Sequence, residues 1–190
     1  MMNELSIKPW LLVRYSRLLA DLQLRINQQI ASDLPSLKEY LATTIPNIEE
    51  LPKELKEYSL STLAILPESD HLCHFDFHPD QVILSPEGPV VIDWMTSFKA
   101  EPAADVARTS ILATLGRVDH LNRMTRIMVE IGKRSLYRVY LRRYLKENKE
   151  VRIDRVKKWM IPIAAARLTE NVPGEKDIIC QFIEKNKRSA

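Results

Sequence analysis

Residues 71–94 read HLCHFDFHPDQVILSPEGPVVIDW, and this segment sets the strand content of the chain. Two short apolar runs, 82–84 and 90–92, flank the sequence Ser-Pro-Glu-Gly-Pro. β-Branched residues favour strands, and proline and glycine favour the turn between them. The segment therefore predicts an antiparallel β-hairpin closed by a five-residue turn.

This turn length places a carboxylate and an amide together at the open end of the hairpin. It pairs Val82 with Ile92, and the next pair is Gln81 opposite Asp93, with Cβ atoms about 5 Å apart. Asp76 lies in the loop that leads in. Oxygen ligands of this kind suit Mg²⁺, which also binds substrate phosphates. A register one residue different would separate the pair, and a turn-capping aspartate beside a merely polar glutamine is the alternative interpretation.

Helical periodicity dominates the rest of the chain. Apolar residues recur three and four apart on one face of residues 9–31, namely Leu11, Tyr15, Leu18, Leu22, Ile26 and Ile30. The other predicted helices cover 35–46, 50–66, 103–115, 117–148, 152–170 and 175–187. Pro162 is expected to interrupt the helix at 152–170. We therefore predict a mainly α fold with one small β-hairpin.

Composition excludes several classes of protein. The four glycines, at 88, 116, 132 and 174, are too far apart for a dinucleotide-binding or P-loop motif, so any phosphate chemistry must use side chains and metal. Two cysteines form no disulfide framework, which fits a reducing compartment. Because no apolar run reaches the length of a signal peptide or a membrane span, we expect a cytoplasmic protein.

Positive charge is concentrated in residues 117–158, which hold 14 Lys/Arg against five Asp/Glu, a net of +9. Such a block can mark a nucleic-acid or membrane surface, but lysine and arginine stems that cover apolar area give the same composition. Tyr137, Tyr140 and Tyr144 recur at helical spacing, which favours packing over base stacking. We therefore expect neither nucleic acid nor a membrane as a partner.

Three linked motifs carry a family likeness. They are HFDFHPDQ at 74–81, VIDW at 91–94 after the hairpin, and EPAADVA at 101–107. In this order and spacing they resemble the H-G-D-x-x-x-x-N, I-D-[WFY] and D-P-x-x-D-L-A motifs of the aminoglycoside phosphotransferase and choline kinase-like family. The resemblance implies a protein kinase-like C-lobe spanning 1–190. Its parts would be leading helices at 9–70, a catalytic loop and metal-binding hairpin at 71–94, and a helical substrate-side subdomain at 101–190.

The resemblance implies ATP- and Mg²⁺-dependent phosphoryl transfer to the hydroxyl group of a small-molecule substrate. Asp76 matches the catalytic aspartate that accepts the hydroxyl proton. Asp93 and Gln81 match the two metal ligands, while His74 and Asp105 would brace the catalytic loop. The residues expected as walls of the substrate site are Trp94, Arg108 and His78, and Arg108 could equally belong to a structural ion pair.

The chain departs from the family pattern at three points. Gln81 replaces the usual asparagine, as in maltokinase-like enzymes, and Phe75 replaces a glycine, which is expected to reshape the loop. The chain also begins at the first C-lobe helix, so the five-stranded N-lobe with its phosphate-binding lysine and adenine-binding hinge is expected to be missing. We therefore expect impaired kinase activity from this chain alone. The surface that an N-lobe would cover should be partly apolar and should bind a second copy or a partner chain.

Other functional readings compete with the kinase. A non-catalytic, pseudokinase-like binding module, or a truncated fragment, would keep the scaffold without the reaction. His71, Cys73, His74 and His78 form a dense set of zinc-type ligands, although a single tetrahedral site needs a loop between ligand pairs. Because the helical block is basic, we expect a neutral or anionic hydroxyl compound as substrate rather than an aminoglycoside.

Overall fold

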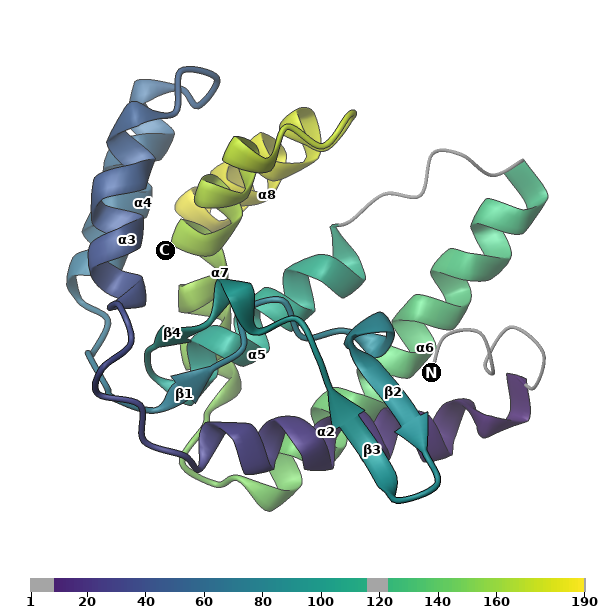
Figure 1. Ribbon diagram of the computed structural model, residues 1–190. Coiled ribbons are helices and arrows are strands. Elements are labelled where there is room, and N and C mark those ends of the chain that lie inside the picture. The colour runs from purple at the N-terminus through teal and green to yellow at the C-terminus, as the bar shows by residue number, and fades with distance from the viewer. Residues whose placement is uncertain (1–8, 116–122, 190) are drawn as a thin grey trace.

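The structure is a computed structural model that describes residues 9–115 and 123–189. The described chain is mostly helical, as predicted, and it carries two small antiparallel sheets, one of which is the predicted hairpin (Figure 1). The α-helices are α2 (Leu12–Asn27), α3 (Leu37–Thr44), α4 (Lys53–Ala64), α5 (Pro102–Thr114), α6 (Arg123–Glu147), α7 (Ile153–Arg167) and α8 (Lys176–Arg188). The strands are β1 (Leu72–Cys73), β2 (Val82–Ser85), β3 (Gly88–Val91) and β4 (Phe98–Lys99). Residues 116–122, where the predicted helix 117–148 begins, lie outside the described residues.

The helix α2 ends at Asn27, four residues earlier than predicted. Beyond it the chain runs beside the segment that enters β1, where Ala31 N donates to Asp70 O at 2.8 Å. Ile30 therefore lies on the surface, 64% exposed, beyond the end of the helix on whose apolar face it was predicted to lie.

The core forms where α5 packs against α7 and α2 packs against α6. The helix α5 crosses the middle of the molecule (Figure 1), and its alanines at 103, 104 and 107 are fully buried. Small side chains allow neighbouring helices to approach closely, and Tyr140 of α6 and Trp159 of α7 are the largest of the fully buried side chains. This places the N-terminal end of α5 directly behind the loop that precedes β2.

Pro162 does not interrupt its helix, contrary to the prediction. Proline removes one backbone hydrogen bond, which leaves the carbonyl of the residue four positions earlier without its helical donor. That residue is Lys158, which is exposed, so water can solvate the carbonyl. The remainder of α7 is held by burial, including Ile161 and Ile163 on either side of the proline.

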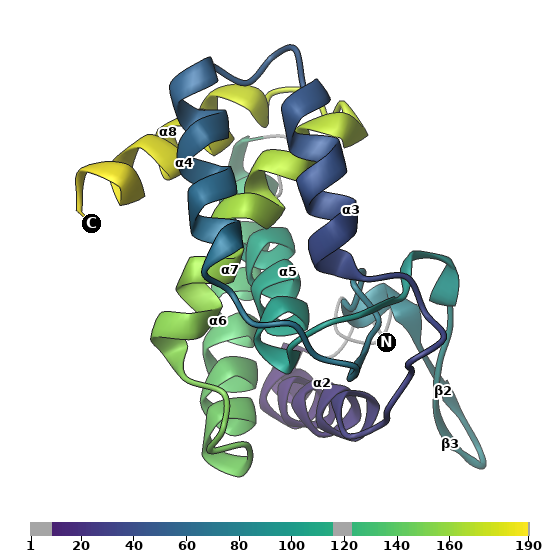
Figure 2. The same cartoon turned by 90° about the vertical axis from the view of Figure 1, so that its left-hand side faces the viewer.

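The hairpin forms in a different register from the predicted one. Val82 pairs with Val91 and Ser85 pairs with Gly88, so Pro86 and Glu87 form a two-residue loop in place of five residues. Gly88 has φ +128°, a conformation that side chains disfavour, and this allows the tight reversal. The hairpin projects from the helical body (Figures 1 and 2).

A second sheet, which the sequence reading did not predict, pairs β1 with β4. Each strand has only two residues, too few for any alternation to be visible. Its pairing of Cys73 with Phe98 closes the base of the whole 74–97 segment. Within the described residues, none of the helices combines the length and apolar character needed to cross a membrane.

Candidate active site

The loop between β1 and β2 is held from behind by Asp105, in the first turn of α5. The side chain of Asp105 is fully buried. Its Oδ1 accepts a hydrogen bond from Phe75 N at 2.8 Å, and its Oδ2 accepts one from Asn27 Nδ2 at 2.9 Å. Asn27 in turn donates to Leu72 O and accepts from the Tyr144 hydroxyl. One carboxylate therefore joins the loop to α2, and through Asn27 to α6.

His74 ties the same loop to the end of β3. The imidazole is fully buried. Its Nδ1 accepts from Asp76 N at 3.3 Å, so the ring is the neutral tautomer that donates from Nε2 to Ile92 O at 2.9 Å. The Trp94 ring lies over it, with ring centres 4.8 Å apart.

Phe75 keeps the backbone conformation that a glycine would favour. Its φ is +64°, in the left-handed region where a bulky residue is strained. The side chain is buried edge-on against Phe98, and the Arg108 guanidinium lies 5.4 Å from its ring centre. The loop therefore keeps the left-handed conformation that glycine favours, and Phe75 does not reshape its backbone as expected. The packing of the Phe75 ring compensates for the strain.

Asp76, Gln81 and Asp93 come together at the mouth of the hairpin. Gln81 Nε2 donates to Asp76 Oδ2 and to Asp93 Oδ2, each at 3.1 Å. In the observed register Gln81 lies opposite Ile92, whose N donates to Gln81 O. Asp93 has φ 64° and ψ 61°, and this left-handed turn redirects its carboxylate towards Gln81. The pair meets as predicted, but by a backbone turn rather than by cross-strand pairing.

This donor set fits a hard divalent cation. The two carboxylates converge on one amide, and oxygen ligands are those that Mg²⁺ prefers. The amide nitrogen now faces both carboxylates, and a half-turn of the amide would present its oxygen instead. Asp93 and Gln81 are therefore the residues that could hold Mg²⁺, with the Asp76 carboxylate beside them.

The two oxygens of Asp76 have different surroundings. Oδ2 takes the Gln81 hydrogen bond and lies 3.5 Å from His78 Nε2. Among the residues that the structure describes, none donates a hydrogen bond to Oδ1. The nearest guanidinium nitrogen, Arg108 Nη2, is 3.7 Å from it. Burial raises the pKa of the Asp76 carboxyl, but the hydrogen bond and charge of His78, followed by Gln81 and Arg108, outweigh it and hold the pKa below its ordinary value. Asp76 is thus a carboxylate at neutral pH, with Oδ1 available.

Arg108 belongs to a chain of ion pairs that the sequence reading missed. Its Nη1 pairs with Glu170 Oε1 at 2.8 Å, and Glu170 Oε2 pairs with Arg167 Nη1 at 2.8 Å. Arg167 binds the buried Glu175 through Nε at 2.5 Å and Nη2 at 2.9 Å. Its nearly complete burial fits the alternative interpretation of Arg108 as a member of a structural ion pair, rather than as an open wall of a substrate site.

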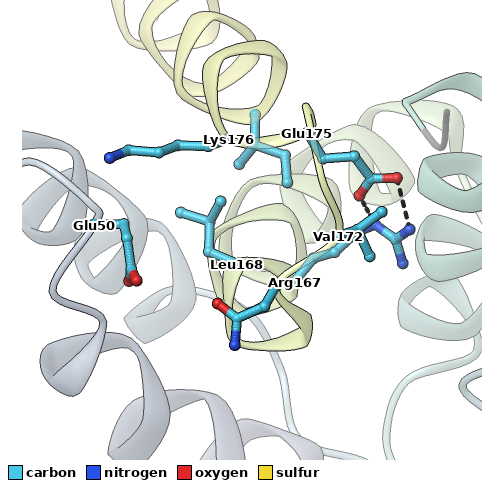
Figure 3. A pocket seen from close by; sticks show the side chains of 8 residues that line it. Glu50, Arg167, Leu168, Val172, Glu175 and Lys176 are labelled. Atoms are coloured by element: carbon cyan, nitrogen blue, oxygen red, sulfur yellow. Dashed lines mark hydrogen bonds and ion pairs between the residues drawn. The ribbon is translucent and has the colours of Figure 1, made fainter. Parts of the chain in front are cut away.

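The far end of this series of ion pairs borders a pocket of about 170 Å³. Its lining comprises Glu50, Arg167, Leu168, Asn171, Val172, Glu175, Lys176 and Ile179. Figure 3 shows the Arg167–Glu175 pair on the side away from Glu50. None of Asp76, Gln81 or Asp93 lines this pocket, so it is separate from the candidate active site.

The zinc interpretation is not supported. Among the described residues, no three His, Cys, Asp or Glu side chains are placed to hold a metal ion together. His71 Nδ1 instead lies 2.7 Å from Asn27 O. The buried Cys73 thiol contacts Ala100 O at 3.7 Å.

The sequence model of the phosphotransferase enzyme family matches residues 8–147, a span that includes the Asp76 loop, the hairpin, Asp105 and Arg108. No match was found among curated proteins.

Proposed function

The chain belongs to the phosphotransferase enzyme family, and we propose that it transfers the γ-phosphoryl group of MgATP to the hydroxyl of a small molecule, with impaired activity as this chain alone. The observation that carries the proposal is the convergence of Asp76 and Asp93 on Gln81, with Oδ1 of Asp76 left available. Phosphoryl transfer depends on a positioned carboxylate and on metal charge at the phosphates. The proposed architecture is a kinase-like C-lobe.

Each residue has a defined task in this mechanism. Asp76 Oδ1 accepts a hydrogen bond from the substrate hydroxyl and then its proton, as the oxygen forms its bond to the γ-phosphorus and the bond to the β-phosphate oxygen breaks. Asp93 and Gln81 would hold Mg²⁺, which neutralises phosphate charge when bound. His74 and Asp105 keep the loop in place through the hydrogen bonds to Ile92 O and Phe75 N.

The substrate proposed is a neutral or anionic hydroxyl compound. Three exposed arginines, Arg134, Arg138 and Arg142, recur every four residues along α6. None of the three forms an ion pair with another described residue. A helical surface of this charge repels polycations such as aminoglycosides.

Calorimetric titration of MgATP tests the metal half of the site. We expect binding to the parent chain and to Asp33→Ala, an exposed aspartate between α2 and α3, and no detectable binding to Asp93→Ala. Loss of one carboxylate removes a metal ligand without touching the core. Equal binding by all three proteins would contradict the assignment of Asp93.

Transfer of labelled γ-phosphate to a panel of neutral polyols, sugar acids and aminoglycosides tests the reaction. We expect transfer to a neutral or anionic acceptor, and a loss of about 10²-fold or more in Asp76→Asn, which lacks the proton acceptor. MgATP binding with no transfer to any acceptor would favour the alternative, a non-catalytic binding module.

A further inference from the structure

Arg108 is almost fully buried and Asp76 is partly buried, yet the two opposite charges do not form a close ion pair. Arg108 Nη2 lies 3.7 Å from Asp76 Oδ1, too far for a hydrogen bond. Charge-assisted hydrogen bonds between such groups close to about 2.7–2.9 Å when nothing restrains them. Some other contact must therefore keep the guanidinium away from the carboxylate.

Two stronger contacts hold Arg108 in place. Its Nε donates to Phe75 O at 3.0 Å, and its Nη1 pairs with Glu170 Oε1 at 2.8 Å. Both are at full hydrogen-bonding distance, and they engage two of the three guanidinium nitrogens. The third nitrogen, Nη2, lies near Asp76 Oδ1 but outside hydrogen-bonding distance of it.

Glu170 is itself held in position by the rest of the ion-pair chain. Its other oxygen, Oε2, pairs with Arg167 Nη1 at 2.8 Å. Arg167 is almost fully buried and is gripped by Glu175 through two hydrogen bonds. A carboxylate fixed in this way cannot follow Arg108 towards Asp76.

We propose that Glu170 is a positioning residue that holds the Arg108 guanidinium off Asp76 Oδ1 and so keeps that oxygen open for the substrate hydroxyl. The inference deepens the proposed phosphoryl transfer and rests on it. A guanidinium hydrogen-bonded to Oδ1 would occupy the lone pair that must accept the substrate proton. At 3.7 Å it supplies positive charge to the loop without blocking the oxygen.

Crystal structures of the parent and of Glu170→Gln test the restraint directly. Glutamine keeps the size of the side chain but removes the charge that binds Arg108 Nη1. We expect Arg108 Nη2 to close on Asp76 Oδ1 to hydrogen-bonding distance in Glu170→Gln. Glu184→Gln, which breaks the exposed Glu184–Arg188 pair, is the matched control and should leave the distance unchanged. An unchanged distance in Glu170→Gln would overturn the proposal.

Steady-state kinetics, with an acceptor found in the transfer screen, provide a second test of the positioning role of Glu170. We expect kcat to fall about tenfold or more in Glu170→Gln, with KM for MgATP unchanged, because only the proton acceptor is obstructed. In the double variant Arg108→Gln/Glu170→Gln, the obstructing group is gone and kcat should recover above that of Glu170→Gln. A merely structural role predicts the opposite, a further loss.

The crystallographic and kinetic experiments together distinguish a failure of this inference from a failure of the proposed function. If the parent transfers phosphate to no acceptor, the proposed function fails, and the crystallographic distance still decides whether Glu170 restrains Arg108. If the parent is active and the double variant is slower than Glu170→Gln, the proposed function stands and the positioning role is wrong.

Discussion

The backbone of Phe75 is strained, whereas its buried side chain stabilises the fold, and substitutions can separate the two effects. Phe75→Ala and Phe75→Gly both remove the buried ring, at about 3–5 kcal/mol for a truncated phenylalanine. Glycine tolerates φ +64° better than alanine, by about 1 kcal/mol. We therefore expect Phe75→Gly to be the more stable of the two variants in urea unfolding.

This order is the reverse of the one found at ordinary positions, where glycine is the less stable residue. Phe77→Ala and Phe77→Gly provide the control, since the neighbouring Phe77 is fully buried and has no positive φ. If alanine were the better residue at both positions, the left-handed strain assigned to residue 75 would be wrong.

Cys73 should be inert towards alkylation in the folded protein. Burial raises the pKa of its thiol well above the ordinary value, with Asp105 adding to the effect, so the reactive thiolate is absent at pH 8. Burial also raises the pKa of Cys180, but that side chain is partly exposed. Iodoacetamide followed by mass spectrometry should label Cys180 first, and Cys73 only after denaturation. Equal labelling in the native state would contradict the burial of Cys73.

Single residues show how far sequence reasoning reached into the site. The likeness of the loop motif placed Asp76, Gln81 and Asp93 in one site, and the structure brings these side chains together. The geometric reason given for it was wrong, because the left-handed backbone of Asp93 leaves no mark in residue type. Aspartate tolerates that conformation better than most residues, but this tendency is too weak to predict it.

At the scale of elements, two glycine-to-alanine substitutions should have opposite effects. Neither Gly88 nor Gly132 has any atom within 4 Å of an added Cβ, so backbone preference decides both cases. Gly88→Ala forces an L-residue to φ +128° and should destabilise the protein by about 1 kcal/mol or more. Gly132→Ala lies within α6 and should stabilise it by up to about 1 kcal/mol.

Thermal unfolding of the two variants beside the parent measures both effects. A lower Tm for Gly88→Ala and a higher Tm for Gly132→Ala are expected. Equal shifts in the same direction would contradict the tight, two-residue hairpin loop.

Helices proved easier to predict than strands. The spacing of Tyr15, Leu22 and Ile26 over about three turns of α2 gives a periodic signal that short elements lack. The strands β1 and β4 have two residues each, and their pairing depends on contacts between residues far apart in the chain. The hairpin was predicted, but its register depends on the length of its loop. The sequence Ser-Pro-Glu-Gly-Pro is compatible with a two-residue loop as well as with the predicted five-residue loop.

At the scale of the whole molecule, one face of the hairpin is apolar and uncovered within the described chain. Ile83 and Val90 form a cross-strand pair and are 49% and 48% exposed, with Ile92 beside them at 36%. Both strands are also edge strands, whose free backbone groups favour pairing with another chain. We expect two copies of the chain to associate through this face.

Sedimentation velocity over a range of concentrations measures this association. The parent should shift from monomer to dimer, and the double variant Ile83→Lys/Val90→Thr should stay monomeric. Ile65→Lys is the control, because Ile65 is 69% exposed at the end of α4, in a different element from the hairpin. A parent chain that sediments as a monomer at every concentration would contradict the expectation.

The ion-pair chain lay beyond sequence reasoning for a physical reason. Arg167 and Glu170 are three residues apart, a spacing typical of a helical ion pair, but Arg108 lies on α5, and only the packing of α5 against α7 brings it to Glu170. Charge at position 108 is equally typical of a solvated helix face, so nothing in its type or spacing marks Glu170 as its partner.

The ion pairs that link Arg108 to Glu170 and Arg167 also have a consequence for the order of events during protein synthesis. A ribosome makes the Asp76 loop and its hairpin well before it makes Glu170 and Glu175. Among the described residues, Arg108 pairs with the carboxylates of Asp76 and Glu170, and only Asp76 is present until the end of α7 emerges and docks. A nascent chain would therefore carry a masked carboxylate, and the base would be released only when the last helices fold into place.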